Sequence, residues 1–186
     1  VWEDRYAHLG TLVRYADDFV VMCSTTAAVE EARQRVGALL TRLGLELHPT
    51  KTRVVDLSWG REGFDFLGCH LRKRLSGPIW ERTHRRVYFL QRGPSQRAMA
   101  RVRARVRDLT PRSRCHTDLR SVIADLNPVL RGWGQYFHTG NAAHHFIDID
   151  AYVERRLRGL RHKRAAGRLT AGQGRRWDRA FFEALG

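Results

Sequence analysis

The sequence predicts an α+β fold in two successive parts, with a boundary near Gly93-Pro94. In residues 1–93, short runs rich in β-branched and aromatic residues alternate with turn residues. In residues 94–186, apolar residues recur at helical spacing. The charge changes along the chain as well: residues 1–70 hold 8 Lys and Arg against 10 Asp and Glu, whereas residues 71–186 hold 26 against 9. We therefore expect a near-neutral sheet with a packed helix, followed by a basic helical bundle.

The first predicted element is a hairpin over residues 11–22. Two runs of strand formers flank Tyr15-Ala16-Asp17-Asp18, which places two adjacent carboxylates at the turn. Adjacent carboxylates repel each other, so folding stability alone does not favour them. Mg²⁺ prefers such oxygen ligands, and two ions can hold the reacting oxygens of a phosphoryl transfer. The alternative is a turn without chemistry, because Asp is a common turn residue.

An amphipathic helix is predicted next, up to Leu43. The cluster Ser24-Thr25-Thr26 supplies N-cap residues, and apolar residues from Val29 to Leu43 recur at helical spacing. Gly44 is placed to end this helix. We expect the apolar face of the helix to pack on a sheet.

Shorter strands are predicted between this helix and residue 94. Residues 45–47, 53–57 and 64–71 have strand-like patterns, and Gly68 within the last run indicates a bulge or a close backbone approach. Residues 79–80 and 87–89 are apolar and predict a further hairpin.

Four helical segments are predicted after residue 94. Residues 95–109 form the first, and residues 117–137 form the second, which Asn127-Pro128 can break or kink. Residues 145–163 form a third helix, and apolar residues between 177 and 185 indicate a short last one. Tyr136 and Phe137 are expected in the core.

Composition limits the classes of partner. The net charge of +15 favours nucleic acid or an anionic membrane surface. Membrane binding is disfavoured, because no apolar run spans a bilayer and no helix has a strongly apolar face opposite its charges. Cys23, Cys69 and Cys115 are far apart in sequence, which disfavours disulfides or a zinc site and fits a reducing cytoplasm.

Several motifs follow one another in a fixed order. Residues 15–18 read Tyr-Ala-Asp-Asp, residues 44–52 read Gly-Leu-Glu-Leu-His-Pro-Thr-Lys-Thr, and residues 64–68 read Phe-Asp-Phe-Leu-Gly. Residues 126–137 then contain Asn-Pro-x-x-Arg-Gly-Trp-x-x-Tyr-Phe. This order resembles the C-terminal portion of bacterial group II intron reverse transcriptases, also called maturases. The last motif distinguishes their thumb from those of retroviral or retron relatives.

The resemblance implies a fold and a set of site residues. Residues 1–93 would be the C-terminal part of a right-hand polymerase palm, and residues 94–186 the helical thumb, or maturase-specific domain. Asp17 and Asp18 would bind two Mg²⁺ ions and carry catalysis, together with an aspartate outside this chain. Residues near the primer and the incoming nucleotide would be Tyr15, Ala16, Lys51, Phe66, Leu67 and Gly68.

The basic helices would bind RNA by the same resemblance. The arginines expected to do so are Arg101, Arg103, Arg105, Arg131, Arg155, Arg156 and Arg158. For Arg131 a helix-packing role is an equal alternative, and a run of arginines is commonly a solvated face. Lys51 is by spacing alone a solvated surface lysine.

The implied activity is RNA-directed DNA polymerisation for a group II intron, with a maturase role in splicing and mobility. The partners would be intron RNA, an RNA template, an RNA–DNA duplex and dNTPs. Glu3 and Asp4 are the only acids before the hairpin and do not resemble the first metal-binding motif. We therefore expect a C-terminal fragment, a split half or a truncated product in the bacterial cytoplasm, without a nuclease domain.

Such a chain would require its missing half or a homodimer partner for polymerisation. Two alternatives remain open, a non-catalytic RNA-binding maturase module and an inert remnant of a mobile element.

Overall fold

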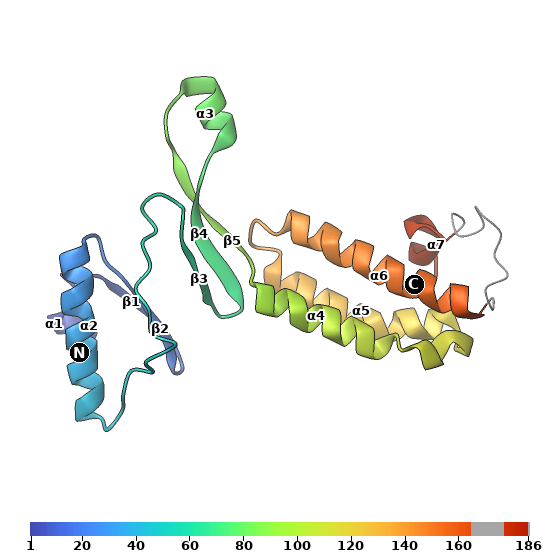
Figure 1. Ribbon diagram of the computed structural model, residues 1–186, viewed down its shortest axis with the longest axis horizontal. Coiled ribbons are helices and arrows are strands. Elements are labelled where there is room, and N and C mark those ends of the chain that lie inside the picture. The colour runs from blue at the N-terminus through green and yellow to red at the C-terminus, as the bar shows by residue number, and fades with distance from the viewer. Residues whose placement is uncertain (165–176, 186) are drawn as a thin grey trace. The chain divides into compact units, whose positions relative to one another are not determined.

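The computed structural model describes residues 1–164 and 177–185. The chain divides into two compact units, residues 1–57 and 58–186, which we describe separately (Figure 1). Within the described residues the fold is α+β, with two small antiparallel sheets and seven α-helices. The predicted fold class is confirmed at this level.

The first unit is a hairpin covered on one face by a helix. After the short helix α1 (Trp2–Arg5), strands β1 (Thr11–Tyr15) and β2 (Asp18–Met22) pair antiparallel, and helix α2 (Thr26–Arg42) follows. The small core of this unit joins all four elements through apolar side chains, among them Trp2, Leu9, Leu12, Phe19, Ala32 and Val36.

The boundaries of α2 agree with its predicted start and stop signals. The Thr25 side chain caps the helix by accepting a hydrogen bond of 3.1 Å from the Ala28 amide. Gly44 follows the helix with φ +70°, and the Leu45 amide donates back to the Leu40 carbonyl at 2.9 Å. This arrangement satisfies carbonyls that the last helical turn leaves unpaired.

The predicted strands at 45–47 and 53–57 are wrong. The described chain is irregular from residue 45 to residue 48 and from 52 to 57. Leu47 nevertheless packs against the core of the first unit. Alternation of apolar residues indicates which side chains are buried, but a strand also needs a neighbouring strand for its ladder of hydrogen bonds.

The second unit begins with a three-stranded sheet in the order β3-β4-β5. Strand β3 (Gly63–Phe66) pairs with β4 (Cys69–Leu75), and β4 pairs with β5 (Tyr88–Pro94). Helix α3 (Gly77–Thr83) connects β4 to β5, so residues 79–80 are helical and the predicted hairpin at 79–89 is wrong.

Gly68 is neither a bulge nor a close approach. Phe66 pairs with Cys69, so Leu67 and Gly68 form a two-residue hairpin turn, with φ values of +49° and +75°. Two positive φ angles are typical of the hairpin turns that match the twist of paired strands. Beyond the two chain neighbours of Gly68, a Cβ added to it would meet no heavy atom within 4 Å, so its φ angle, not crowding, accounts for the glycine.

A helical bundle completes the second unit. It comprises α4 (Gln96–Leu109), a 3₁₀ turn (Arg112–His116), α5 (Leu119–Phe137), α6 (Ala143–Arg164) and α7 (Arg179–Glu183). Pro128 lies inside α5 without interrupting it. Leu126 and Leu130, on either side of Pro128, both pack into the bundle core, which explains why the helix continues.

The bundle core is the largest apolar cluster in the described chain. Val106 of α4 and Val122 of α5 are fully buried, and Leu126 is 1% exposed. Leu157, Leu160 and Phe182 bring α6 and α7 into the same cluster. Among the described helices, none combines the length and apolar content that crossing a bilayer requires.

Candidate active-site turn and nucleic-acid interface

The Asp17-Asp18 pair lies at the tip of the first hairpin. Tyr15 pairs with Asp18, which leaves Ala16 and Asp17 as a two-residue turn. Ala16 has φ +54°, a region that residues with a Cβ rarely adopt. The Arg14 side chain donates a hydrogen bond of 2.7 Å to the Ala16 carbonyl and supports this turn. Backbone strain of this kind concentrates at functional sites.

The pairing register decides which way the acidic residues face. Residues directly opposite each other in an antiparallel pair share a face, so Asp18 lies on the same face as Tyr15. Leu12 and Val21 lie on the other face and pack toward α2. Asp17 and Asp18 are exposed, and Tyr15 is 65% exposed. The hairpin therefore presents its carboxylates to solvent, with the tyrosine beside Asp18.

The donor set at this turn fits part of a Mg²⁺ site. Carboxylate oxygens are the ligands that Mg²⁺ prefers, and the ion commonly takes only one or two from protein. The described residues contain no group of three or more His, Cys, Asp or Glu side chains that would hold a metal ion. A two-ion site at this turn would therefore need at least one further carboxylate.

Lys51 lies in a turn of its own. The Lys51 amide donates to the His48 carbonyl at 3.3 Å, and the Thr52 amide donates to the same oxygen at 3.0 Å. Lys51 is exposed, and no hydrogen bond or ion pair among the described residues joins its side chain to Asp17 or Asp18. Its role toward the nucleotide stays a prediction.

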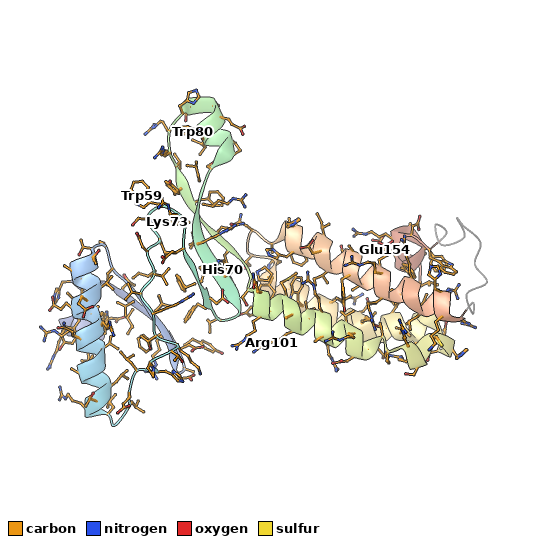
Figure 2. The ribbon with its side chains drawn as sticks, viewed as in Figure 1. Trp59, His70, Lys73, Trp80, Arg101 and Glu154 are labelled. Atoms are coloured by element: carbon orange, nitrogen blue, oxygen red, sulfur yellow. The ribbon has the colours of Figure 1, made fainter. Side chains whose placement is uncertain are left out.

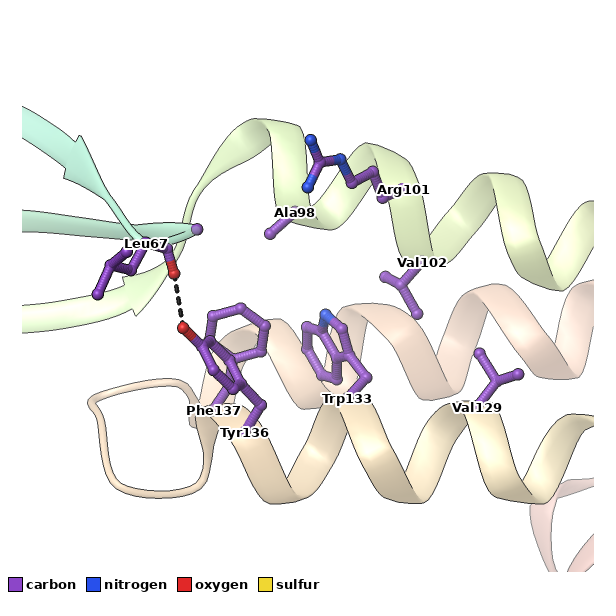
Figure 3. Close-up of a pocket in the computed structure, with 9 residues that line it drawn as sticks. Leu67, Ala98, Arg101, Val102, Val129, Trp133, Tyr136 and Phe137 are labelled. Carbon is purple, nitrogen blue, oxygen red and sulfur yellow. Dashed lines mark hydrogen bonds between the residues drawn. The ribbon is translucent and has the colours of Figure 1, made fainter. Parts of the chain in front are cut away.

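The turn at Leu67-Gly68, which follows Phe66, is attached to the helical bundle. The Tyr136 hydroxyl of α5 donates to the Leu67 carbonyl at 2.7 Å (Figure 3). The Ser95 amide at the start of α4 donates to the Gly68 carbonyl at 2.9 Å. Two helices thus fix the backbone of this turn.

Tyr136 was expected in the core, and this expectation is wrong, because its side chain is 50% exposed. Phe137 is buried as expected. Adjacent helical residues point about 100° apart, so the two rings cannot both face the centre of the core. The helical period could have revealed this from sequence, but the hydrogen bond to Leu67 could not have been foreseen.

The base of the β4–β5 ribbon is attached to the bundle as well. The Arg92 side chain donates to the Cys69 sulfur at 3.3 Å and to the Thr139 hydroxyl at 3.1 Å. The Asn141 amide donates to the Arg92 carbonyl at 2.7 Å. Cys69 is buried in one cluster with Phe137 and the neighbouring Ala142. Strands and helices of this unit therefore meet in a bonded junction.

An open pocket of about 430 Å³ lies between the Leu67-Gly68 turn and the groove of α4 and α5. Apolar side chains form most of its lining, with Arg101 at its edge (Figure 3). The indole nitrogen of Trp133 is buried and has no hydrogen-bond partner among the described residues.

The predicted RNA-binding arginines of α4 do not form one face. Arg101 and Arg105 are one turn apart and lie on the α5 side of the helix, where Arg101 lines the pocket. Arg103 lies on the α6 side, beside His145 and Asp148. Burial lowers the pKa of His145. All three arginines are exposed, and Figure 2 shows Arg101 projecting from the bundle.

The remaining predicted arginines have three different settings. Arg131 is exposed and, by the helical period, lies on the side of α5 opposite Trp133. Arg155 is exposed on α6. Arg156 donates to the Thr110 hydroxyl at 2.9 Å and to the carbonyls of Arg107 and Thr110, so it caps the end of α4. Arg158 pairs with Glu154 and donates to the Trp177 carbonyl, which ties α6 to the segment before α7.

Comparison with known protein families gives two matches in chain order. Residues 3–71 match the family described as reverse transcriptase (RNA-dependent DNA polymerase). Residues 99–179 match the family described as group II intron, maturase-specific domain. A search of curated proteins found no match. The order of the two matches is the order that the sequence motifs predict.

Proposed function

Because the chain belongs to the group II intron reverse transcriptases, or maturases, we propose that it binds RNA and RNA–DNA duplexes and contributes two metal-binding carboxylates to RNA-directed DNA synthesis. In this proposal residues 1–93 are the C-terminal part of the palm, and residues 94–186 are the thumb. The two family matches, which lie on either side of this boundary, support the division.

The observation that carries the catalytic part is the exposed acidic turn. Asp17 lies in the strained two-residue turn and Asp18 follows it as the first residue of β2, both inside the reverse transcriptase match. They would hold Mg²⁺, which stabilises the charge that develops on the phosphate oxygens when it is bound. A further aspartate, from outside residues 1–186, would complete the site.

Other residues of the chain would orient the nucleic acid and the dNTP. Tyr15, exposed on the same face as Asp18, would lie with Ala16 beside the primer terminus. Lys51 would supply a cation toward the phosphates of the incoming nucleotide and stabilise the pyrophosphate leaving group. The turn formed by Phe66, Leu67 and Gly68 would hold the primer strand, supported by its bonds to α4 and α5.

The RNA-binding part rests on charge and exposure. Arginine guanidinium groups match phosphate geometry, and binding through phosphates is strongly salt-dependent. The exposed members of the predicted set are Arg101, Arg103, Arg105, Arg131 and Arg155. Arg156 and Arg158 already donate hydrogen bonds within the fold, so we expect them to contribute less to RNA affinity.

One observation favours an alternative function. Within the described residues no third metal-binding side chain joins Asp17 and Asp18. The chain would then act as a non-catalytic maturase module that binds intron RNA through its basic helices.

Primer extension separates the two functions. The chain is incubated with Mg²⁺, dNTPs and a DNA primer annealed to an RNA template, beside an Asp17→Asn/Asp18→Asn variant. Extension that disappears in the variant supports the catalytic function. Duplex binding without extension leaves either the non-catalytic module or one part of a polymerase that needs a further carboxylate from elsewhere, and failure of the chain to bind RNA or duplex at all contradicts both functions.

A further inference from the structure

A two-stranded arm extends from the bundle between the two family matches. We define the β-arm as residues 72–91, which comprise most of β4, helix α3 and the first half of β5 (Figure 1). Residues 72–98 belong to neither match. Seven-residue strands of this kind are about 23 Å long.

The β-arm is strongly basic. Its charged side chains are one Glu, at position 81, and six cations. All six cations are exposed, and none of them forms an ion pair within the part of the chain that the structure describes. They are Arg72, Lys73, Arg74, Arg82, Arg85 and Arg86. A surface with so few compensating acids attracts polyanions.

Three of the six cations lie on the paired strands, on both faces of the ribbon. Successive strand residues point to opposite faces, so Arg72 and Arg74 share one face and Lys73 lies on the other. The Arg72 side chain donates to Gln91 across the strands at 2.9 Å, which fixes the orientation of that guanidinium. Both faces of the β-arm can therefore contact phosphates at once.

Exposed apolar side chains lie among these cations. Trp80, which Figure 2 shows on α3, is 37% exposed. Phe89 and Leu90 on β5 are 40% and 57% exposed. Arg86 lies over the Trp80 ring at 6.0 Å. Phe89 pairs directly with Arg74 across the ribbon. Aromatic rings among arginines fit the sugars and bases of a nucleic acid as well as its phosphates.

The β-arm is held at its base and ends in α3 at its tip. Cys69 and Arg92 fix the base to the bundle through the contacts described above. Antiparallel pairing continues up to the pair Leu75 and Tyr88. Beyond this pair, α3 lies in the connection between the two strands. Arg72, Lys73 and Arg74 therefore lie on paired strands and Arg82 lies on α3, whereas Arg85 and Arg86 lie in the irregular segment between α3 and β5.

We propose that the β-arm binds double-helical RNA, with cations on its two faces contacting the phosphates on either side of the wide, shallow minor groove. This inference rests on the proposed RNA-binding function and adds a surface distinct from the helix arginines. The charge, the exposed aromatic residues and the two-sided placement of the cations carry it.

The first test neutralises the tip of the β-arm. Binding of a labelled RNA duplex is measured by fluorescence anisotropy over a salt series for Arg82→Gln/Arg85→Gln/Arg86→Gln. The matched control is Arg5→Gln/Arg33→Gln/Arg42→Gln, which removes the same charge from exposed positions of the first unit. We expect affinity at physiological salt to fall at least about tenfold and the salt slope to shrink by about 2 to 3 in the arm variant. The control variant should change the RNA affinity and the salt slope far less.

The second test removes the tip without opening the ribbon. Leu75 and Tyr88 are paired, so an Asn-Gly turn can replace residues 76–87 and close the hairpin in the same register. We expect a loss of RNA-duplex affinity at least as large as in the first test. An unchanged melting temperature for the bundle shows that the fold is retained.

The outcomes separate this inference from the proposed function. If the unmodified chain binds RNA and both arm variants bind the RNA duplex equally well, the β-arm proposal is wrong and the proposed function stands. If the unmodified chain binds no RNA, both fail. Equal losses for single-stranded and double-helical RNA would overturn the duplex assignment. Loss of binding to phosphatidylserine vesicles, with RNA binding intact, would make the arm a membrane contact instead.

Discussion

The chain contains two hairpin turns of the same length in very different surroundings. In the first unit, Ala16 and Asp17 form a two-residue turn whose only side-chain support in the described chain is Arg14 of the same hairpin. In the second unit, Leu67 and Gly68 form a two-residue turn whose two carbonyls accept hydrogen bonds from α5 and α4. The first turn exposes carboxylates, whereas the second presents backbone fixed by helices.

This difference indicates two kinds of function. Exposed acids on a turn are suited to a metal ion, because Mg²⁺ can exchange one or two of its water ligands for accessible carboxylate oxygens. A turn anchored by neighbouring helices is suited to positioning a strand of nucleic acid, since its backbone cannot shift without breaking tertiary hydrogen bonds. We therefore propose that the first turn binds the metal ion and that the second turn positions a strand of nucleic acid.

The largest expected effect is on catalysis at the first turn. Asp18→Asn keeps the size of the side chain and removes its charge, so we expect primer extension to fall at least about a hundredfold in any preparation that extends a primer. Binding of the RNA–DNA duplex should stay nearly unchanged. Asp108→Asn, at an exposed position on α4, is the control. Undiminished extension by Asp18→Asn would remove the first turn from the active site.

The next effect concerns the bundle that anchors the second turn. Leu126 is 1% exposed, so Leu126→Ala should lower the free energy of unfolding of the second unit by about 3 kcal/mol. Leu90→Ala, at a position 57% exposed, should have little effect on the same denaturant transition. Similar losses for the two variants would show that the bundle core does not lie where the structure places it.

Arg155 and Arg156 allow a sharper distinction between structural and RNA-binding arginines. Arg156→Gln removes the hydrogen bonds that cap α4 and should cost about 1 to 3 kcal/mol of stability while leaving the salt slope of RNA binding unchanged. Arg155→Gln, at the exposed neighbouring position, should leave stability unchanged and reduce the salt slope by about 1. Denaturation curves and salt-dependent binding curves of both variants test this distinction. Lower stability in Arg155→Gln together with a smaller salt slope in Arg156→Gln would reverse the two assignments.

The smallest effect compares the two turns directly. Gly68 has φ +75°, so Gly68→Ala should lower stability by about 1 kcal/mol. Ala16→Gly relieves strain at φ +54° but makes the unfolded chain more flexible, so the net change should be close to zero. Thermal melts of the two variants test this asymmetry. A stabilising Gly68→Ala would contradict the left-handed conformation at that position.

Helices were largely predictable from the sequence, because their signals are local. Caps such as Thr25 and Ser95 and the stop at Gly44 lie within a few residues of the boundaries they set. The strands predicted at 45–47 and 53–57 failed because a strand depends on a partner distant in sequence. Gly68 was misinterpreted for a related reason, since one continuous apolar run does not show where a tight turn divides it.

The acidic turn was also predictable, because its residues are adjacent in the chain. The roles of individual arginines were not predictable. The fold brings the Arg156 side chain to the carbonyls of Arg107 and Thr110, whereas the side chain of its neighbour Arg155 is exposed. The β-arm was not predictable, because its cations lie in separate groups between residues 72 and 86 and come together only when β4 pairs with β5.

We propose that the basic second unit binds nucleic acid, and that Asp17 and Asp18 bind the metal ion used in DNA synthesis. Equilibrium binding of an RNA template annealed to a DNA primer, measured over a salt series for the unmodified chain and for Asp17→Asn/Asp18→Asn, tests it most directly. We expect the affinity to fall steeply with rising salt, and the two proteins to show nearly the same dependence of affinity on salt concentration. Binding that is insensitive to salt, or that is lost in the variant, would contradict it.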